Sequence, residues 1–235
     1  MNLNRAVDVT TINGVNEIKE KQNEYDVVVT KRYYLIVKRL CDLILSFIGL
    51  VLLSPVFLVI VILIKIDSKG PAFFVQNRIG KNGKLFKLYK FRSMVLNADE
   101  ILFKMLREDE VMRDEYRINK KLKDDPRMTR VGLFLRKISL DELPQLLNIF
   151  LGDMSFIGPR PYLERELIDI DGYYDYIVAC KPGLSGLWQV SGRSNVTFES
   201  RLKIDKEYYY IKSLKMDTKI FFDTIKFVVK KEGAM

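Results

Sequence analysis

A stretch of 22 residues without a charged side chain, Leu43 to Ile64, is the feature that most constrains the fold of this 235-residue chain. As one straight helix it would be about 33 Å long, enough to cross a hydrocarbon core of about 30 Å. Pro55 lies near its middle, however, and a proline inside a helix removes a hydrogen bond and kinks the chain. The two arms, about 18 and 15 Å long, would then each reach only half-way across a bilayer. The pattern therefore predicts a helix that bends at Ser54-Pro55.

Basic residues flank this stretch on both sides. Residues 31–93 hold twelve Lys or Arg and two Asp, a net charge of +10 in a chain whose total is +9. Basic residues mark the cytoplasmic side of a membrane segment, so a segment that enters and returns on one side accounts for both flanks, including Lys38 and Arg39. We therefore expect a re-entrant, monotopic membrane hairpin. A kinked spanning helix and a buried core helix are the alternatives.

The composition excludes several kinds of chemistry. The chain contains no histidine, which rules out Ser-His and Cys-His catalysis and histidine-ligated metals. Its two cysteines, Cys41 and Cys180, lack zinc-ligand spacing, and we expect no disulfide between them in a cytoplasmic setting. Catalysis must then depend on carboxylates, lysine, arginine or an oxygen-bound metal. Basic charge around an apolar segment favours anionic headgroups or phosphorylated ligands over nucleic acid.

The chain divides into three predicted regions. Residues 1–30 are polar and aperiodic, so we expect a weakly ordered extension. Residues 31–69 are expected to form the membrane-embedded re-entrant helix, and residues 70–235 a cytosolic domain. The predicted fold class is α+β and mainly helical, with a small β-hairpin around Asn82-Gly83 and amphipathic helices at the membrane interface. Helical patterns extend over 95–123, 162–180 and 199–229.

Two carboxylates lie side by side in the segment Ser139-Leu140-Asp141-Glu142-Leu143-Pro144-Gln145. Ser139 and Glu142 match a capping box, in which case both acids simply begin a helix. Pro144 favours a helix that begins later, at the proline itself. In either arrangement the two carboxylates lie beside free helix N–H groups with Arg136 nearby, and such surroundings suit a phosphate or a divalent cation.

Further basic residues are spaced so that they could bind phosphate. Lys90 and Arg92 are two apart on a predicted strand and are expected to point to one face. The segment Gly158-Pro159-Arg160-Pro161 predicts a rigid turn that presents one arginine. Each group also has a plainer interpretation as solvated surface charge.

In this order the motifs resemble the bacterial sugar transferases, the monotopic phosphoglycosyl transferases that begin glycoconjugate assembly on a polyprenyl phosphate. The resemblance covers about Lys31 to the C-terminus. It rests on Lys38-Arg39, Ser54-Pro55, Arg78-Ile79-Gly80, Lys90-Phe91-Arg92-Ser93-Met94, Ser139 to Gln145 and Gly158 to Pro161. The loop Trp188-Gln189-Val190-Ser191-Gly192-Arg193 further resembles members that transfer hexose phosphates. Larger relatives add N-terminal spanning helices, so the chain looks like the catalytic unit alone.

The resemblance implies transfer of a sugar 1-phosphate, galactose or glucose first, from a UDP-sugar to undecaprenyl phosphate, giving undecaprenyl-diphosphate-sugar and UMP with Mg²⁺ required. Asp141 would be the nucleophile and form a phosphosugar-aspartyl intermediate. Glu142 would hold Mg²⁺ together with Asp141, or act as a base. The substrate would be bound by Lys90, Arg92, Arg136, Arg160, Gln189 and Arg193.

The resemblance also implies a place on the cytoplasmic face of the bacterial inner membrane, at the start of exopolysaccharide, capsule or O-antigen synthesis. Lipid headgroups are expected partners and nucleic acid is not. A homodimer and contacts with downstream glycosyltransferases stay open. The main alternative is a non-catalytic membrane adaptor that gathers anionic lipid or a partner protein, and it predicts that Asp141→Asn leaves function intact.

Overall fold

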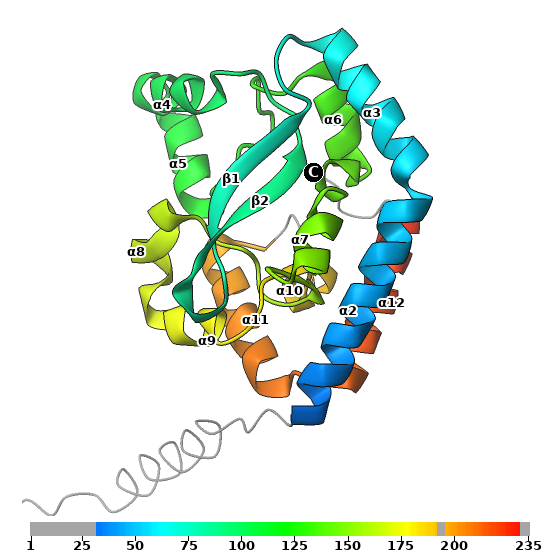
Figure 1. The fold of residues 1–235 in the computed structure, drawn as a ribbon. Helices are drawn as coiled ribbons and strands as arrows, with labels where there is room; N and C mark the ends of the chain where they lie inside the picture. Colours follow the sequence, from blue (N-terminus) through cyan, green and yellow to red (C-terminus); the bar gives the residue numbers. More distant parts are fainter. Residues whose placement is uncertain (1–31, 192–195, 231–235) are drawn as a thin grey trace, which may run out of the picture.

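The computed structural model describes residues 32–191 and 196–230, and the predicted extension over residues 1–30 lies outside them. Two long helices run along one side of the molecule, and a β-hairpin crosses its centre (Figure 1). These elements are α2 (Arg32–Leu52), α3 (Ser54–Asp67), β1 (Phe73–Ile79) and β2 (Leu85–Phe91). The chain continues through α4 (Ala98–Glu108), α5 (Glu110–Asn119), α6 (Arg130–Lys137), α7 (Gln145–Leu151), β3 (Ser155–Ile157), α8 (Leu167–Ile170), α9 (Tyr174–Val178), β4 (Gly183–Ser185), α10 (Leu187–Val190), α11 (Phe198–Ile211) and α12 (Leu214–Lys230), with 3₁₀ turns at Lys81–Gly83, Leu140–Glu142, Glu164–Glu166 and Asp171–Tyr173. The predicted α+β, mainly helical chain with a small β-hairpin is confirmed.

The apolar stretch bends at the proline, as predicted. α2 ends at Leu52 and α3 begins at Ser54, with Pro55 in the first turn of α3, where its missing N–H removes no helix hydrogen bond. The two helices meet at an angle of 60°. Within residues 32–191 and 196–230 no single helix is long and apolar enough to cross a bilayer, but α2 and α3 together have the length and composition of a broken span or a re-entrant loop. Membrane insertion stays a prediction.

Polar side chains in the N-terminal half of α2 fasten this helix to the rest of the molecule. Lys38 Nζ donates to the carbonyl oxygen of Ile157 at 2.8 Å and pairs with the carboxylate of Asp217. Arg39 donates to two carbonyl oxygens in the last turn of α7 at 2.6 and 2.8 Å, and Asp42 accepts hydrogen bonds from β3 at 3.0 and 3.1 Å. Lys38 and Arg39 therefore have partners within the protein, while their predicted place at the headgroup plane stays a prediction.

The central hairpin forms around the predicted Asn82-Gly83 turn, where Asn82 adopts a φ of 58°. β1 and β2 pair antiparallel, from Phe73 opposite Phe91 to Ile79 opposite Leu85. One end of the hairpin packs between α3 and α6 through Phe91, and its middle packs on α7 through Leu88. These two contacts fix the strand that carries Lys90 relative to the segment between α6 and α7, which carries Asp141 and Glu142.

A second, smaller sheet was not predicted. β3 and β4 pair in parallel, with Ser155 opposite Gly183 and Ile157 opposite Ser185. The predicted helical region 199–229 is confirmed as α11 and α12, and 95–123 folds as two helices that break at Asp109, whose carboxylate accepts a hydrogen bond from the N–H of Met112 and so caps α5.

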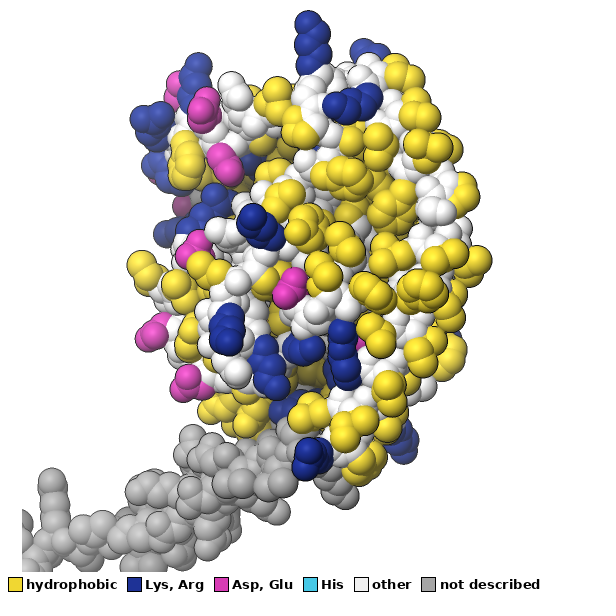
Figure 2. Space-filling view, in the orientation of Figure 1, with side chains coloured by type: hydrophobic (Ala, Val, Ile, Leu, Met, Phe, Trp, Pro, Cys, Tyr) yellow, Lys and Arg dark blue, Asp and Glu magenta, His cyan; other side chains and the backbone are white. Residues whose placement is uncertain are grey.

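Large hydrophobic side chains gather along α2 and α3 and over the neighbouring α6 and α7 (Figure 2). We call the exposed hydrophobic residues of α2 and α3 the apolar face. They include Ile44, Phe47, Ile48, Val51, Leu52, Leu58, Val59 and Ile62. Charged side chains lie mainly over the opposite half of the same view.

Candidate active site

Asp141 and Glu142 lie in a tight turn between α6 and α7. The turn is a single 3₁₀ segment, Leu140–Glu142, preceded by Ser139 at a φ of 58°. The Ser139 side chain makes no capping hydrogen bond, so the capping-box interpretation is wrong. The left-handed backbone at Ser139 explains this, because a capping residue needs an extended backbone. Helix α7 begins at Gln145, directly after Pro144, as the alternative interpretation predicted.

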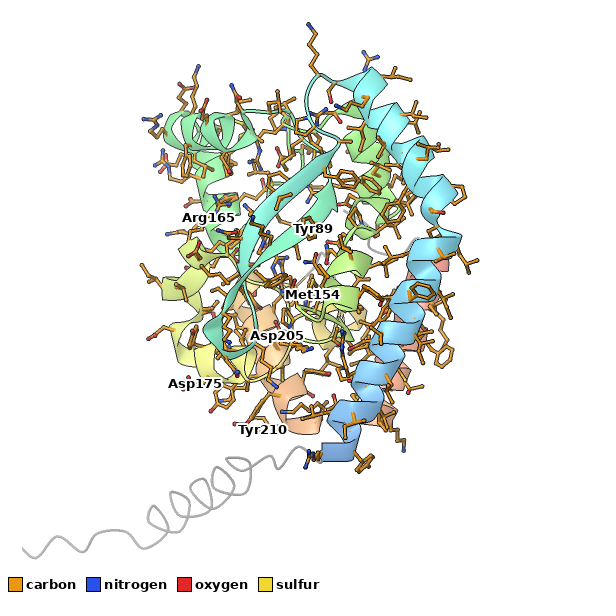
Figure 3. The ribbon with its side chains drawn as sticks, in the orientation of Figure 1. Tyr89, Met154, Arg165, Asp175, Asp205 and Tyr210 are labelled. Carbon is orange, nitrogen blue, oxygen red and sulfur yellow. The ribbon has the colours of Figure 1, made fainter. Side chains whose placement is uncertain are left out.

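Lys90 reaches this turn from the neighbouring strand β2. Its Nζ atom lies 2.6 Å from Glu142 Oε1, and both side chains are partly exposed. Tyr89, the residue before Lys90, is labelled on β2 in Figure 3. Lys90, which the family resemblance assigned to the substrate, is thus paired with Glu142 in the structure.

The two carboxylates have different surroundings. Burial raises the pKa of Asp141, and the charge of Glu142 acts in the same direction against the pull of Lys90 and Arg136. Burial would raise the pKa of Glu142 as well, but the attraction and hydrogen bond of Lys90, with the charges of Arg160 and Arg136, hold that pKa below its ordinary value. Neighbouring acids whose pKa values are driven apart can take different roles in one reaction.

Asp141 is 7% exposed, and no side chain in the described part of the chain is hydrogen-bonded to its carboxylate. Glu142 has one oxygen paired with Lys90, which leaves its Oε2 atom without a hydrogen bond from the described residues. Within those residues, no three or more acids or cysteines are placed so that together they could hold a metal ion. A cation held by one or two carboxylates and completed by substrate phosphates, the usual arrangement for Mg²⁺, fits this pair of acids.

Cations surround the turn. Arg136 on α6 and Arg160 were expected from the sequence, and the positive field of both reaches Glu142. The structure adds Lys121 and Arg201, which the sequence analysis did not single out. Burial, and then the charges of neighbouring arginines, lower the pKa of each. Positive side chains held close to one another in this way are an arrangement that suits the binding of an anionic group. Arg201 lies in α11 and Lys121 lies just after the end of α5, both in charge-rich stretches where nothing in the spacing separates them from surface residues.

Arg160 belongs to a turn that hydrogen bonds from two strands hold in place. The N–H of Gly158 donates to Ser185 in β4 at 2.9 Å, and that of Gly183 donates to Pro159 at 2.8 Å. Arg78 in β1 donates to the Pro161 carbonyl at 2.9 Å. The predicted rigid turn is therefore braced by β1 and β4. Arg78, known from the sequence only as part of a motif, has this structural partner.

The glycine-rich loop contributes Trp188 and Gln189 from the short helix α10. Among the described residues, neither Trp188 Nε1 nor Gln189 Oε1, both buried, has a hydrogen-bond partner. The guanidinium of Arg201 lies 5.1 Å from the Trp188 ring centroid and donates to the Val196 carbonyl at 3.0 and 3.1 Å. Arg193 lies outside the described residues, so its expected contact with substrate stays a prediction.

Arg92 differs from the expectation that it shares a face with Lys90 at the site. Its guanidinium donates to Ser68 and to the Lys69 carbonyl at 2.7 and 2.8 Å, beyond the end of α3. Gly70, with a φ of 117°, lies against this guanidinium, since a Cβ there would come within 2.2 Å of Arg92 Nη1. Strand β2 ends at Phe91, one residue before Arg92. The Arg92 side chain bonds instead to the segment that connects α3 to β1.

Comparison with known proteins connects this site to a family. The sequence profile described as "Bacterial sugar transferase" matches residues 33–231. The chain is 44% identical over 206 residues to the undecaprenyl-phosphate galactose phosphotransferase of Salmonella typhimurium, which covers 88% of this chain and 43% of that protein. It is 46% identical over 197 residues to the UDP-galactose-lipid carrier transferase of Erwinia amylovora, which covers 84% and 41%.

A third relative has a similar length. The exopolysaccharide production protein ExoY of Sinorhizobium fredii is 44% identical over 197 residues, and the alignment covers 84% of this chain and 87% of that protein. The chain thus spans less than half of the first two relatives and most of the third. Since the profile match extends through nearly all described residues, including every element around Asp141 and Glu142, the chain belongs to the bacterial sugar transferase family.

Proposed function

We propose that this chain transfers a sugar 1-phosphate from a UDP-sugar to undecaprenyl phosphate, giving undecaprenyl-diphosphate-sugar and UMP. Galactose and glucose are the proposed sugars, and the names of two relatives include galactose. The observation that carries the proposal is the buried Asp141 carboxylate, free of side-chain hydrogen bonds from the described residues, next to a Glu142 that is paired with Lys90.

Asp141 is the proposed nucleophile. One of its carboxylate oxygens attacks the sugar-bearing phosphorus of the donor, and the bond from that phosphorus to the UMP oxygen breaks. The products of this half-reaction are UMP and an aspartyl-phosphosugar. A phosphate oxygen of undecaprenyl phosphate then attacks the same phosphorus, and Asp141 regains its free carboxylate.

The remaining residues stabilise charge and hold the substrate. Lys90, Arg136 and Arg160 neutralise the diphosphate as negative charge moves onto the departing UMP. Glu142 either holds a cation or accepts the proton of the lipid phosphate. Mg²⁺, when bound by Asp141 and Glu142, offsets phosphate charge and orients the donor. Gln189 and Arg193 are proposed to contact the donor from the glycine-rich loop.

The acceptor explains why the site would lie beside an apolar face. Undecaprenyl phosphate keeps its tail in the membrane and its phosphate at the headgroup plane, so an enzyme acting on it must hold its site at that plane. We place the chain on the cytoplasmic face of the bacterial inner membrane with α2 and α3 embedded in one leaflet, where the product begins a polysaccharide. The net +10 of residues 31–93 suits the anionic headgroups of that leaflet.

The test is intact-protein mass spectrometry. Detergent-solubilised protein is incubated with Mg²⁺ and a panel of UDP-sugars in the absence of lipid acceptor. The wild type and a control variant, Asp175→Asn, at an exposed acid on α9, should gain the mass of one hexose phosphate, and Asp141→Asn should gain none.

The other outcomes separate the alternatives. An adduct on Asp141→Asn would refute the aspartyl mechanism. If no donor gives an adduct, and no UMP is released when undecaprenyl phosphate is added, the transferase proposal fails and a non-catalytic membrane adaptor is the better account.

A further inference from the structure

We propose that Asp205 on α11 is a positioning residue that holds the turn bearing Arg160 and so aims its guanidinium at the diphosphate of the donor. This inference rests on the proposed function, because it assigns Arg160 to the nucleotide diphosphate. Asp205 itself touches neither substrate nor the reacting atoms.

Two hydrogen bonds join Asp205 to the turn. Its Oδ2 atom accepts from the backbone N–H of Arg160 at 3.2 Å and from the Tyr162 hydroxyl at 2.7 Å. The first bond fixes the residue that carries the guanidinium, and the second fixes the chain two residues later. The turn is thus held by three elements, β1, β4 and α11. Within the described structure, only the bond from α11 is made to the backbone of Arg160 itself.

The burial of Asp205 makes these bonds strong determinants of local structure. Its side chain is 1% exposed, and Tyr162 is 0% exposed. Figure 3 labels Asp205 among the interior side chains, on α11. A buried carboxylate is retained at a large desolvation cost, so loss of its partners leaves polar groups unsatisfied. The turn therefore has little freedom to move while Asp205 is present.

Arg160 is held in place through its backbone, and hydrogen bonds of its guanidinium to the described residues play no part. Among the described residues, Arg160 Nε has no hydrogen-bond partner, and neither has Asp205 Oδ1. The backbone of Arg160 is thus tied down while its side chain makes no hydrogen bond to those residues. This arrangement suits a side chain whose partner is an anionic ligand.

The electrostatic setting of Asp205 indicates which replacement is conservative. Arg160 and Arg201 both attract Asp205, and Arg201 lies one helical turn before it on α11. Burial raises the pKa of Asp205 to about 7, so near neutral pH its neutral and charged forms are both populated. The neutral amide of asparagine, whose oxygen accepts the same two hydrogen bonds, is therefore a fair conservative replacement.

The experiment is a double-mutant cycle on UDP binding, with UDP as the probe and the full chain in detergent. Calorimetry gives the dissociation constant for wild type, Arg160→Ala, Asp205→Ala and the double variant. In the wild-type background Arg160→Ala should weaken binding about tenfold or more, as expected for a charged hydrogen bond. In the Asp205→Ala background the same change should weaken it less than about threefold, because the guanidinium is no longer aimed.

Two further backgrounds keep the test sharp. In the Asp205→Asn background, Arg160→Ala should again weaken UDP binding by nearly the wild-type factor. Tyr162→Phe, which removes one of the two bonds and keeps the core filled, should reduce that factor even if Asp205→Ala fails to fold. The matched control is Tyr208→Phe, on the same helix as Asp205. It removes a buried hydroxyl that donates to Asp217 at 2.7 Å. In this background Arg160→Ala should weaken UDP binding by the same factor as in the wild type.

The outcomes distinguish the two proposals. If Arg160→Ala weakens UDP binding by the same factor in every background, Asp205 is merely structural and this inference is wrong, while the proposed function stands. If the wild type neither binds UDP nor releases UMP, the proposed function fails and this inference fails with it.

Discussion

At the scale of single residues, the ion pair of Lys90 and Glu142 sets the charge state of the site. Lys90 lowers the pKa of Glu142 and also opposes the rise in the pKa of Asp141. Its positive charge therefore keeps both acids ionised to lower pH than their burial alone would permit. A nucleophilic carboxylate must be ionised, so Lys90 would act on the attacking group as well as on the phosphates.

Replacement of Lys90 tests this. Lys90→Met should raise the pKa of both acids, so the rate of adduct formation on Asp141 should fall at a higher pH than in the wild type. The rate at neutral pH should drop by about 10² to 10³, the usual cost of removing one charge-stabilising group. The measurement is the pH dependence of UMP release in a single turnover.

Lys87→Met is the control for this prediction. Lys87 is an exposed lysine on the same strand, three residues before Lys90. Its loss should leave both the rate and the acidic limb of the profile unchanged. An acidic limb that does not move in Lys90→Met would mean that other groups, such as Arg136, control the ionisation of Asp141.

At the scale of elements, the short parallel sheet of β3 and β4 determines where Arg160 lies. Gly158 follows β3 directly and packs against the chain that enters β4. A Cβ at this position would come within 2.3 Å of the Lys181 carbonyl oxygen and 2.8 Å of the Gly183 nitrogen. Backbone atoms cannot swing aside as the end of a flexible side chain can, so this glycine is required by close approach.

Gly158→Ala should therefore destabilise the protein and displace the Arg160 turn. Overpacking of this kind costs about 1 to 3 kcal/mol, which corresponds to a fall in Tm of roughly 3 to 10 °C for a chain of this size. A thermal unfolding scan in detergent measures it. Gly172→Ala is the matched control, because a Cβ at Gly172 has no neighbour within 4 Å, and its Tm should stay at the wild-type value.

Elements with a strong local signal could be predicted from the sequence. The helix bend follows from Pro55, and the central hairpin from the Asn82-Gly83 pair between two runs of strand pattern. Both signals act within a few residues, so no knowledge of the tertiary structure is needed. The grouping of Lys90 with Asp141 and Glu142 was expected from the family resemblance.

Features set by distant contacts could not be predicted. β3 and β4 have three residues each and pair across a long separation in sequence, and such short segments carry no measurable periodicity. The capping-box interpretation of Ser139 was wrong, because the backbone there is left-handed and the helix begins only after Pro144. Strand alternation placed Arg92 beside Lys90, yet the strand ends one residue before Arg92 and the side chain caps α3 instead.

At the scale of the whole molecule, the apolar face is the feature that exposure to water would make unfavourable. Side chains such as Phe47 and Leu52 on α2 and Leu58 on α3 are more than half exposed. Hydrophobic side chains gather along these two helices (Figure 2). Contiguous exposed apolar surface on this scale marks a membrane or protein interaction site. On the inner side, α2 is tied to the globular part by Lys38, Arg39 and Asp42. One side of α2 thus bonds to the rest of the protein, while the other side is exposed and apolar.

In the proposed membrane placement, the bend between α2 and α3 decides on which side of the membrane the N-terminal end lies. A straight helix over Arg32 to Asp67 would be about 54 Å long, more than enough to cross a bilayer. Replacing both Ser54 and Pro55 by leucine removes the kink, so we expect the N-terminal end to move to the far side of the membrane. An N-terminal epitope tag should then become inaccessible to protease added from the cytoplasmic face, whereas in the wild type it should be cleaved.

Ser54→Ala is the control, since it removes the hydroxyl that donates to the Val51 carbonyl at 2.8 Å but keeps the proline, and its tag should stay accessible. The opposing force is the set of polar bonds on α2, because transfer of the N-terminal end would break the pairing of Lys38 with Asp217 and strand Arg39 and Asp42 without partners. A tag that remains accessible in the leucine variant would mean that these bonds, and not Pro55, hold both ends of the apolar stretch on one side.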